Sequence, residues 1–324
     1  MQKAILSDMF TGRLKSEIPP VLVAFVEALL DKPIVELDLS DNAFGPAGAE
    51  PLQKLLIENR NIQILRLNNN GLGIGGAKLI AAALKEHVEK CKADGVESNL
   101  KTIVMGRNRM ESEGASILSE SLALHSNLEV IRMPQNSIRP EGIKVLMSSF
   151  SNCKKLQVVD VQDNTFTKPG CEALVAALPS WKDLKELNIG ECLLGAKGGK
   201  LVIQALTDSC ENLETLLLSY NEIDLHGAEM IPAMLANKTK LKKLELNGNA
   251  FQPDAEVVER ISAVLTRHGN EDALDELDDM EVFSDEDEAE ESEEDSDDEA
   301  AKGEDMDELT AAMGGTKIWK VVDF

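Results

Sequence analysis

The sequence is poor in aromatic residues and has no long apolar run. Phenylalanine, tryptophan and tyrosine make up 3% of its 324 residues, so we expect an aliphatic core. No run of about 18 apolar residues is present, and the first fifteen residues lack the apolar segment of a secretory signal. We therefore expect neither a membrane-spanning segment nor a membrane partner.

Cysteine and histidine are also scarce. The five cysteines and four histidines are dispersed, and none of the cysteines forms the C-x-x-C spacing typical of a zinc site. An odd number of scattered cysteines favours reduced thiols over disulfides. We expect no metal site, no cofactor of the chain's own and a location in the cytoplasm.

Charge of one sign is concentrated near the carboxyl end. The formal net charge is −25, and residues 271–308 hold 23 acidic residues and a single lysine. Dense like charge with little hydrophobicity predicts disorder. We expect an acidic disordered tail over residues 271–310, without order from Leu274 onward. A short segment over residues 311–324 follows, whose KIWKVVDF is a candidate docking motif. We expect no nucleic-acid partner.

A leucine-rich pattern dominates the rest of the chain. In the stretch LRLNNNGLG, Leu65 and Leu67 alternate as on a strand with one buried face, and the Asn70 amide turns inward to satisfy backbone groups. Cys192 takes the asparagine position of one repeat as a small hydrogen-bonding substitute. The template L-x-x-L-x-L-x-x-N-x-L recurs mostly every 28 residues, with first positions at Ile34, Ile62, Leu100, Leu128, Leu156, Leu184, Leu213 and Leu241.

A repeat of about 28 residues has room for a strand and a helix. Apolar residues at helical spacing predict helices over residues 76–91, 140–153, 169–181 and 253–269, the last of them ended by Gly269. The predicted fold class is α/β: a leucine-rich-repeat solenoid, a ribonuclease-inhibitor-like horseshoe with parallel concave strands and convex helices. We place this domain at residues 1–270 and expect a monomer.

Two irregularities interrupt the pattern. Ile5, Asp8 and Phe10 fit the L-x-x-N-x-L half of a further repeat. We therefore expect this chain to start inside a repeat, without a capping element. The ten extra residues before Leu100, KCKADGVESN, are polar, and we expect them to form a loop at the end of the preceding helix.

The sequence holds no catalytic constellation. It has no phosphate loop and no nucleophile elbow. The glycines of GLGIGG (71–76) fall at a strand-to-helix turn, where glycine permits a tight bend. The residue before each consensus asparagine is expected at a strand end on the concave side. Seven of these eight are polar or aromatic, which favours an interface with a protein: Asp41, Asn69, Arg107, Gln135, Asp163, Glu191, Tyr220 and Gly248.

Several motifs extend beyond the repeat consensus. They are MFTGRLKSEIP (9–19), LSDNAFGPAGAEPL (39–52), LNNNGLG (67–73), GRNRMES (106–112), QNSIRPEGI (135–143), QDNTFTKPG (162–170), ELNGNAF (245–251) and ELDDME (276–281). On these motifs, which include positions outside the core, the chain resembles the Ran GTPase-activating protein family over residues 1–300.

The resemblance implies a function. Members of this family bind the small GTPase Ran in its GTP-bound form and stimulate GTP hydrolysis, which resets the nucleotide gradient that drives nucleocytoplasmic transport. Ran carries the GTP and the magnesium, so the activator needs no active site of its own. An asparagine of the activator, rather than an inserted arginine, orders Ran's own glutamine, which positions the attacking water. The matching residue is Asn69, whose amide offers both a donor and an acceptor.

The resemblance also implies roles for charged residues. Arg13, in FTGR, matches an arginine that the family requires for activation, and we expect it to anchor the Ran-facing edge. Alternatively, Arg13 is a surface residue paired with Asp8 or Asp41. The arginines of GRNR are expected to contact acidic groups on Ran. The predicted partner-binding set is Lys15, Asp41, Arg107, Arg109, Gln135 and Asp163.

Two alternatives fit parts of the sequence. The first is a non-catalytic leucine-rich-repeat binding or inhibitor protein. The inhibitor type shares the long repeat, but it alternates two repeat types and is rich in cysteine, unlike this chain. An acidic histone chaperone shares the tail, but its repeats are shorter. We expect the tail to attract Ran, Ran-binding proteins or karyopherins electrostatically, and Ser284, Ser292 and Ser296 to be candidate phosphorylation sites. The resemblance places the protein in the cytoplasm or at the cytoplasmic side of the nuclear envelope.

Overall fold

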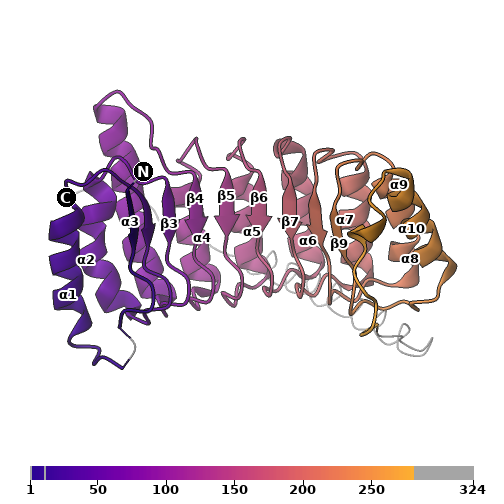
Figure 1. Cartoon of the computed structure of the whole chain (residues 1–324), viewed down its shortest axis with the longest axis horizontal. Helices are drawn as coiled ribbons and strands as arrows, with labels where there is room; N and C mark the ends of the chain where they lie inside the picture. The colour runs from indigo at the N-terminus through magenta and orange to yellow at the C-terminus, as the bar shows by residue number, and fades with distance from the viewer. Residues whose placement is uncertain (1, 11, 281–324) are drawn as a thin grey trace, which may run out of the picture. The chain divides into compact units, whose positions relative to one another are not determined.

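The computed structural model describes residues 2–10 and 12–280, which form one parallel sheet with helices along one side (Figure 1). The strands lie in chain order: β1 (Gln2–Ile5), β2 (Ile34–Asp38), β3 (Ile64–Arg66), β4 (Thr102–Val104), β5 (Val130–Arg132), β6 (Val158–Asp160), β7 (Glu186–Asn188), β8 (Thr215–Leu217) and β9 (Lys243–Glu245). Every strand pairs with the next, so this part of the chain is an open leucine-rich-repeat solenoid, as predicted.

A helix follows each strand. These are α1 (Ile18–Leu29), α2 (Gly45–Glu58), α3 (Gly73–Ala93), α4 (Glu111–Leu122), α5 (Pro140–Phe150), α6 (Thr167–Ala177), extended by η1 (Leu178–Ser180), α7 (Gly195–Thr207), the short α8 (Leu225–Ala228) and α9 (Ile231–Leu235), and α10 (Glu256–Arg267) before η2 (Glu271–Ala273). The four predicted helices are confirmed as α3, α5, α6 and α10. Gly269, with a φ of 76°, ends the last of them as expected.

The core lies between the strands and the helices and is aliphatic. Leu65 and Leu67 in the β3 repeat are fully buried, while Arg66 between them stays partly exposed. Burying one such leucine contributes roughly 2 kcal/mol, and the contribution recurs in every repeat. Of the helices in residues 2–10 and 12–280, none combines the length and the apolar character needed to cross a membrane.

The consensus asparagines link neighbouring repeats. The Oδ1 of Asn70 accepts a hydrogen bond from the backbone N–H of Asn42 at 3.0 Å, and its Nδ2 donates to the carbonyl of Leu39 at 3.0 Å. The same backbone-to-amide bond, at 2.9–3.2 Å, joins Asn70 to Asn108, Asn108 to Asn136, Asn136 to Asn164, Cys192 to Asn221 and Asn221 to Asn249. The predicted role of these amides is therefore confirmed. The thiol of Cys192 substitutes for the amide: its one S–H lies within hydrogen-bonding distance of two backbone carbonyls, at 3.3 and 3.5 Å.

The first strand has a different register from the one predicted. Ala4 pairs with Leu37 of β2, and because Leu37 faces the core, Ala4 does too. Ile5 is 53% exposed and is not a core position. A shift of one residue exchanges the two faces of a strand. The predicted alignment of Ile5 with a leucine position and of Asp8 with the asparagine position is therefore wrong by one residue.

The insertion before Leu100 is partly helical. Its first four residues, 90–93, continue α3, which reaches 21 residues. Cys91 in this extra turn is buried, so the turn is held by the core. The predicted loop is limited to residues 94–99, with Gly95 at a φ of 72° just after the helix.

The repeat domain extends past residue 270. Leu274, Leu277 and Met280 pack against the core, and Leu274 forms a β-bridge with Leu244 of β9. Asp275 accepts hydrogen bonds from two backbone amides just after β9, at 2.9 and 3.1 Å. We call residues 274–280 the C-terminal strap. The tail was expected to begin at residue 271 and to lack order from Leu274. Both expectations are wrong here because apolar residues recur among the acidic ones. The remaining tail predictions, including KIWKVVDF and the three serines, lie outside the described residues.

Candidate functional site

The residue before each consensus asparagine adopts a left-handed backbone. We call these eight residues the strand-end row. Its φ values lie between 51° and 61° at Asp41, Asn69, Arg107, Gln135, Asp163, Glu191 and Tyr220, and φ is 70° at Gly248. This conformation costs a non-glycine residue about 1–2 kcal/mol. A regular bond offsets it: each of the first seven donates its backbone N–H to a carbonyl of the next repeat, as Asn69 does to Gly106 at 2.9 Å. The sequence template does not reveal this backbone geometry.

Asn69 stands at the carboxyl end of β3 with its side chain exposed. Its Nδ2 donates a hydrogen bond to Oδ1 of Asp41, in the preceding repeat, at 3.0 Å. The neighbouring Asn68 has a different role, because its Oδ1 accepts from the backbone N–H of Gly106 at 2.6 Å. Asn68 therefore holds the loop, while Asn69 presents an amide to solvent.

A second bonded group follows along the strand-end row. The Nε of Arg107 donates to Oε1 of Gln135, and the Nε2 of Gln135 donates to Oδ2 of Asp163 at 2.7 Å. The structure thus brings together three of the predicted partner-binding residues. A guanidinium, an amide and a carboxylate in sequence offer both donors and acceptors to a polar partner surface.

Arg13 and Lys15 lie in the loop between β1 and α1, and both are exposed. This loop adjoins the Asp41 repeat, because the Oδ1 of Asn42 accepts from the backbone N–H groups of Met9 and Phe10, at 2.8 and 3.3 Å. The interpretation of Arg13 as a surface residue paired with Asp8 or Asp41 stays an alternative.

Arg109 lies just beyond the strand-end row, two residues after Arg107. It is exposed, and its backbone is left-handed, with a φ of 52°. Arg13, Lys15 and Arg109 are thus all exposed.

Two ion-pair clusters on the strands, at positions between the template leucines, were not predicted from the sequence. Glu36 lies between Lys3 and Arg66, at 2.6 and 3.1 Å, and hydrogen bonding to Lys3 and Arg66 lowers the pKa of Glu36. Further along, Arg132 bonds to Asp160 at 2.9 Å and to both oxygens of Glu186 at 2.8 and 2.9 Å. The signal was present in the sequence: these residues occupy variable positions that flank the template leucines of each strand, and opposite charges in nearby strands attract.

Tyr220 links the strand-end row to the C-terminal strap. Its hydroxyl donates to Oδ2 of Asp279 at 2.8 Å, and this hydrogen bond raises the pKa of Tyr220. Asp279 also accepts from Nδ2 of Asn247 at 3.3 Å, and its backbone N–H donates to Oδ1 of Asn247 at 2.9 Å. The C-terminal strap is therefore hydrogen-bonded to the strand-end row at Tyr220.

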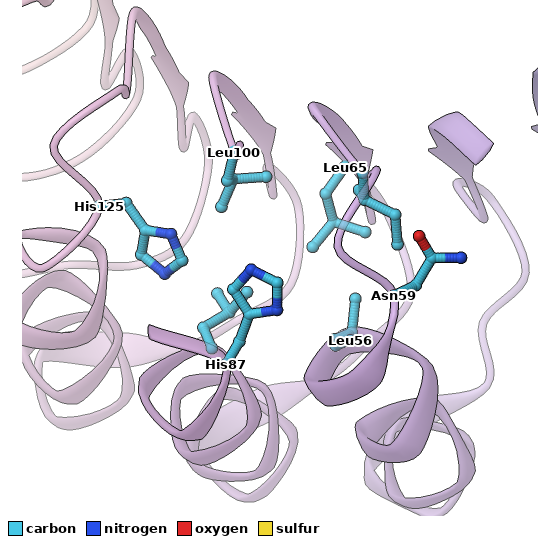
Figure 2. A pocket seen from close by; sticks show the side chains of 8 residues that line it. Leu56, Asn59, Leu65, His87, Leu100 and His125 are labelled. Atoms are coloured by element: carbon cyan, nitrogen blue, oxygen red, sulfur yellow. The ribbon is translucent and has the colours of Figure 1, made fainter. Parts of the chain in front are cut away.

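Two histidines lie inside the core, between the helices and the strands (Figure 2). His87 of α3 and His125, just after α4, have ring centroids 6.1 Å apart and line a small cavity with leucines of neighbouring repeats. Nδ1 of His125 lies 2.8 Å from Oγ of Ser98. Burial, reinforced by His87, lowers the pKa of His125 to about 3. The described residues hold no group of three or more His, Cys, Asp or Glu placed to bind a metal ion, and we assign these histidines to the core.

Comparison with known proteins relates this arrangement to a family. A leucine-rich-repeat family model matches residues 32–52, 58–81 and 152–175. The chain is 38% identical over 265 residues to Ran GTPase-activating protein 1 of Saccharomyces cerevisiae, covering 79% of this chain and 65% of the relative. It is 49% identical over 122 residues to Ran GTPase-activating protein 1 of Xenopus laevis, covering 36% of this chain and 21% of the relative. The chain is therefore similar in sequence to proteins named Ran GTPase-activating protein, and it contains leucine-rich repeats.

The resemblance to Ran GTPase-activating proteins is therefore confirmed at the level of sequence. Ran GTPase-activating protein 2 of Caenorhabditis elegans is 50% identical over 125 residues, or 37% of this chain and 13% of the relative. The chain spans less than two thirds of the length of each of these relatives. In this chain, Asn69 and its neighbours are presented on the strand-end row.

Proposed function

We propose that this chain binds the small GTPase Ran in its GTP-bound form and stimulates GTP hydrolysis. The observation that carries the proposal is the 49% identity over 122 residues to a protein named Ran GTPase-activating protein 1. In this proposal Ran carries the GTP and the magnesium, and the chain, acting as a monomer, supplies no cofactor and no nucleophile. Its work belongs to nucleocytoplasmic transport, in the cytoplasm or at the cytoplasmic side of the nuclear envelope.

Asn69 is the residue that acts on Ran's catalytic glutamine. Hydrolysis needs a water held in line with the γ-phosphate, and a glutamine can hold that water only if its own amide is oriented. An amide is well suited to brace another amide, because each offers one donor group and one acceptor. The Asn69 side chain is exposed, and its Oδ1 makes no hydrogen bond within residues 2–10 and 12–280, which supports this role.

The part of the strand-end row that follows Asn69 supplies binding rather than chemistry. Arg107, Gln135 and Asp163 form a bonded group that faces outward beside Asn69, and Arg13 stands on the loop of the first repeat. Guanidinium groups bind carboxylates with two parallel hydrogen bonds. We therefore assign Arg107 and Arg109 to acidic groups on Ran, and Arg13 and Lys15 to the edge that anchors it.

The direct test is phosphate release from Ran loaded with GTP, measured with and without the chain. Acceleration at a substoichiometric amount of the chain supports the proposal. Binding without acceleration would favour the alternative of a non-catalytic binding protein. Arg13→Ala should reduce activation, and comparing the saturating rate with the half-saturating concentration will show whether Arg13 acts in binding, in hydrolysis or in both.

The acidic tail speeds association with Ran, Ran-binding proteins or karyopherins by attracting their basic surfaces. Long-range attraction raises the association rate and fades with salt. The test is a deletion of residues 281–324, which spares the C-terminal strap. The deletion should slow association at low salt and have little effect at high salt; equal association rates at low salt would refute this role.

A further inference from the structure

The orientation of the Asn69 amide is set by its neighbour. Asp41 is the one side chain among the described residues that bonds to the Asn69 side chain, through Nδ2 and Oδ1 at 3.0 Å. A carboxylate only accepts hydrogen bonds, so the amide nitrogen must face Asp41. Rotating the amide by half a turn would place its oxygen against the carboxylate oxygen, and the two would repel. The carboxylate therefore decides which end of the amide faces outward.

The bond to Asp41 leaves a complementary pair of groups on Asn69. One N–H is used, and the second N–H and the oxygen remain for a partner. A partner amide needs one acceptor and one donor, so this is the pair that it requires. Without Asp41, the two orientations of the Asn69 amide would be closer in energy, and only one of them presents the groups correctly.

The backbone holds Asp41 and Asn69 in place. Both residues are left-handed, with φ values of 61° and 51°, and both donate their backbone N–H to the next repeat at 2.9 Å. On the other side, Arg107 is bonded to Gln135 rather than to Asn69. The strand-end row is thus divided into two bonded groups, and Asn69 belongs with Asp41.

We infer that Asp41 is a positioning residue that orients the Asn69 amide for its contact with Ran's glutamine. This inference rests on the proposed function. It differs from the expectation drawn from the sequence, in which Asp41 was only a contact for the partner. Asp41 acts through Asn69, so its effect must appear in the rate of hydrolysis at saturation rather than in the affinity for Ran.

The test is single-turnover hydrolysis on Ran loaded with GTP, over a range of activator concentrations. Asp41→Ala should lower the saturating rate by about tenfold to 100-fold, the range expected when a catalytic group is misplaced. The half-saturating concentration should change little. Asp41→Asn keeps an oxygen that can accept the bond and should restore most of the rate. Asp41→Gly removes the carboxylate without straining a left-handed backbone and should match Asp41→Ala.

A double-variant comparison separates positioning from a structural role. In an Asn69→Ala background, Asp41→Ala should have no further effect on the saturating rate, because the group it orients is gone. An equal loss in both backgrounds would overturn the inference. Glu97→Ala is the matched control: Glu97 is an exposed carboxylate that accepts from the amide of Asn127 at 3.2 Å, away from the strand-end row, and its loss should leave the rate unchanged.

The inference and the proposed function can fail separately. A wild-type saturating rate for Asp41→Ala, in a chain that does activate Ran, would refute the positioning role alone. If the chain does not activate Ran, the proposed function fails, and the orientation is decided by the NMR signals of the Asn69 side-chain amide protons. These signals should shift, and their exchange with water should quicken, in Asp41→Ala; unchanged signals would refute the orientation itself.

Discussion

Lowering the pH from 7.5 to 5 should destabilise the repeat domain through His125. This side chain is fully buried, and its Nε2 has no hydrogen-bond partner among the described residues. Burial, with the nearby His87, lowers its pKa to about 3. In the unfolded chain the pKa is about 6.5. At pH values between these two pKa values, His125 is protonated in the unfolded state and neutral in the folded state.

The sign and the size follow from proton linkage. A folded-state pKa below the unfolded value means that stability is complete above pH 6.5 and is lost as the pH falls toward 3. The loss per pH unit in that window is about 1.4 kcal/mol, so His125 should cost about 2 kcal/mol between pH 7.5 and pH 5. His87, whose pKa is also lowered mainly by burial, acts in the same direction.

Urea unfolding of the wild type and of His125→Gln at the two pH values is the assay. The variant should be less stable at pH 7.5 but should lose about 2 kcal/mol less than the wild type on going to pH 5. His226→Gln is the control, because the His226 side chain is 73% exposed, and it should lose as much as the wild type. An equal loss in His125→Gln and the wild type would refute the reasoning.

Three further predictions concern the repeat framework. Cys192→Asn should raise the free energy of unfolding by about 1 kcal/mol, because an amide oxygen would replace the sulfur that faces the backbone N–H of Asn164; a lower urea midpoint would contradict this. Asn108→Ala should lower the free energy of unfolding by about 3 kcal/mol or more, since two backbone N–H groups and three carbonyls lose their partner. A loss below 1 kcal/mol in the same assay would argue against a stabilising role for the consensus asparagines. Asp275→Ala should speed hydrogen exchange at the backbone amide of Leu246, because this amide donates a hydrogen bond to the Asp275 carboxylate at 2.9 Å. Unchanged exchange would show that the C-terminal strap does not depend on this bond.

Much of the fold was predictable because its signals are local and periodic. The two leucines and the asparagine of LRLNNNGLG fix a strand and a turn, and recurrence at 28 residues fixes parallel neighbours. Gly71 and Gly73, with φ values of 62° and 57°, confirm the predicted turn in GLGIGG.

The ends of the domain were harder to predict, because no full repeat is present there. At β1 the only guide was a partial template, and the pairing of Ala4 with Leu37 decides the register. At the other end, acidic composition suggested disorder, but Leu274 and Leu277 bury apolar surface against the core. A count of charges averages over such residues, and packing depends on each one.

The site was predictable in its residues but not in its geometry. Template spacing placed Asp41, Asn69 and Arg107 at strand ends, and the structure finds them there. The left-handed backbone and the bond from Asn69 to Asp41 depend on contacts between repeats, which spacing within one repeat does not encode. The roles of these residues toward Ran are still predictions.

Asn69 is central to the proposed activation of Ran, and one measurement tests its role directly: single-turnover GTP hydrolysis by Ran at saturating concentrations of the wild type and of Asn69→Ala. We predict that the wild type accelerates hydrolysis and that Asn69→Ala lowers the saturating rate by orders of magnitude, with little change in the half-saturating concentration. Asn69→Gly, which suits the left-handed backbone, should give the same loss and exclude strain as its cause. An equal saturating rate for the wild type and both variants would contradict the central claim.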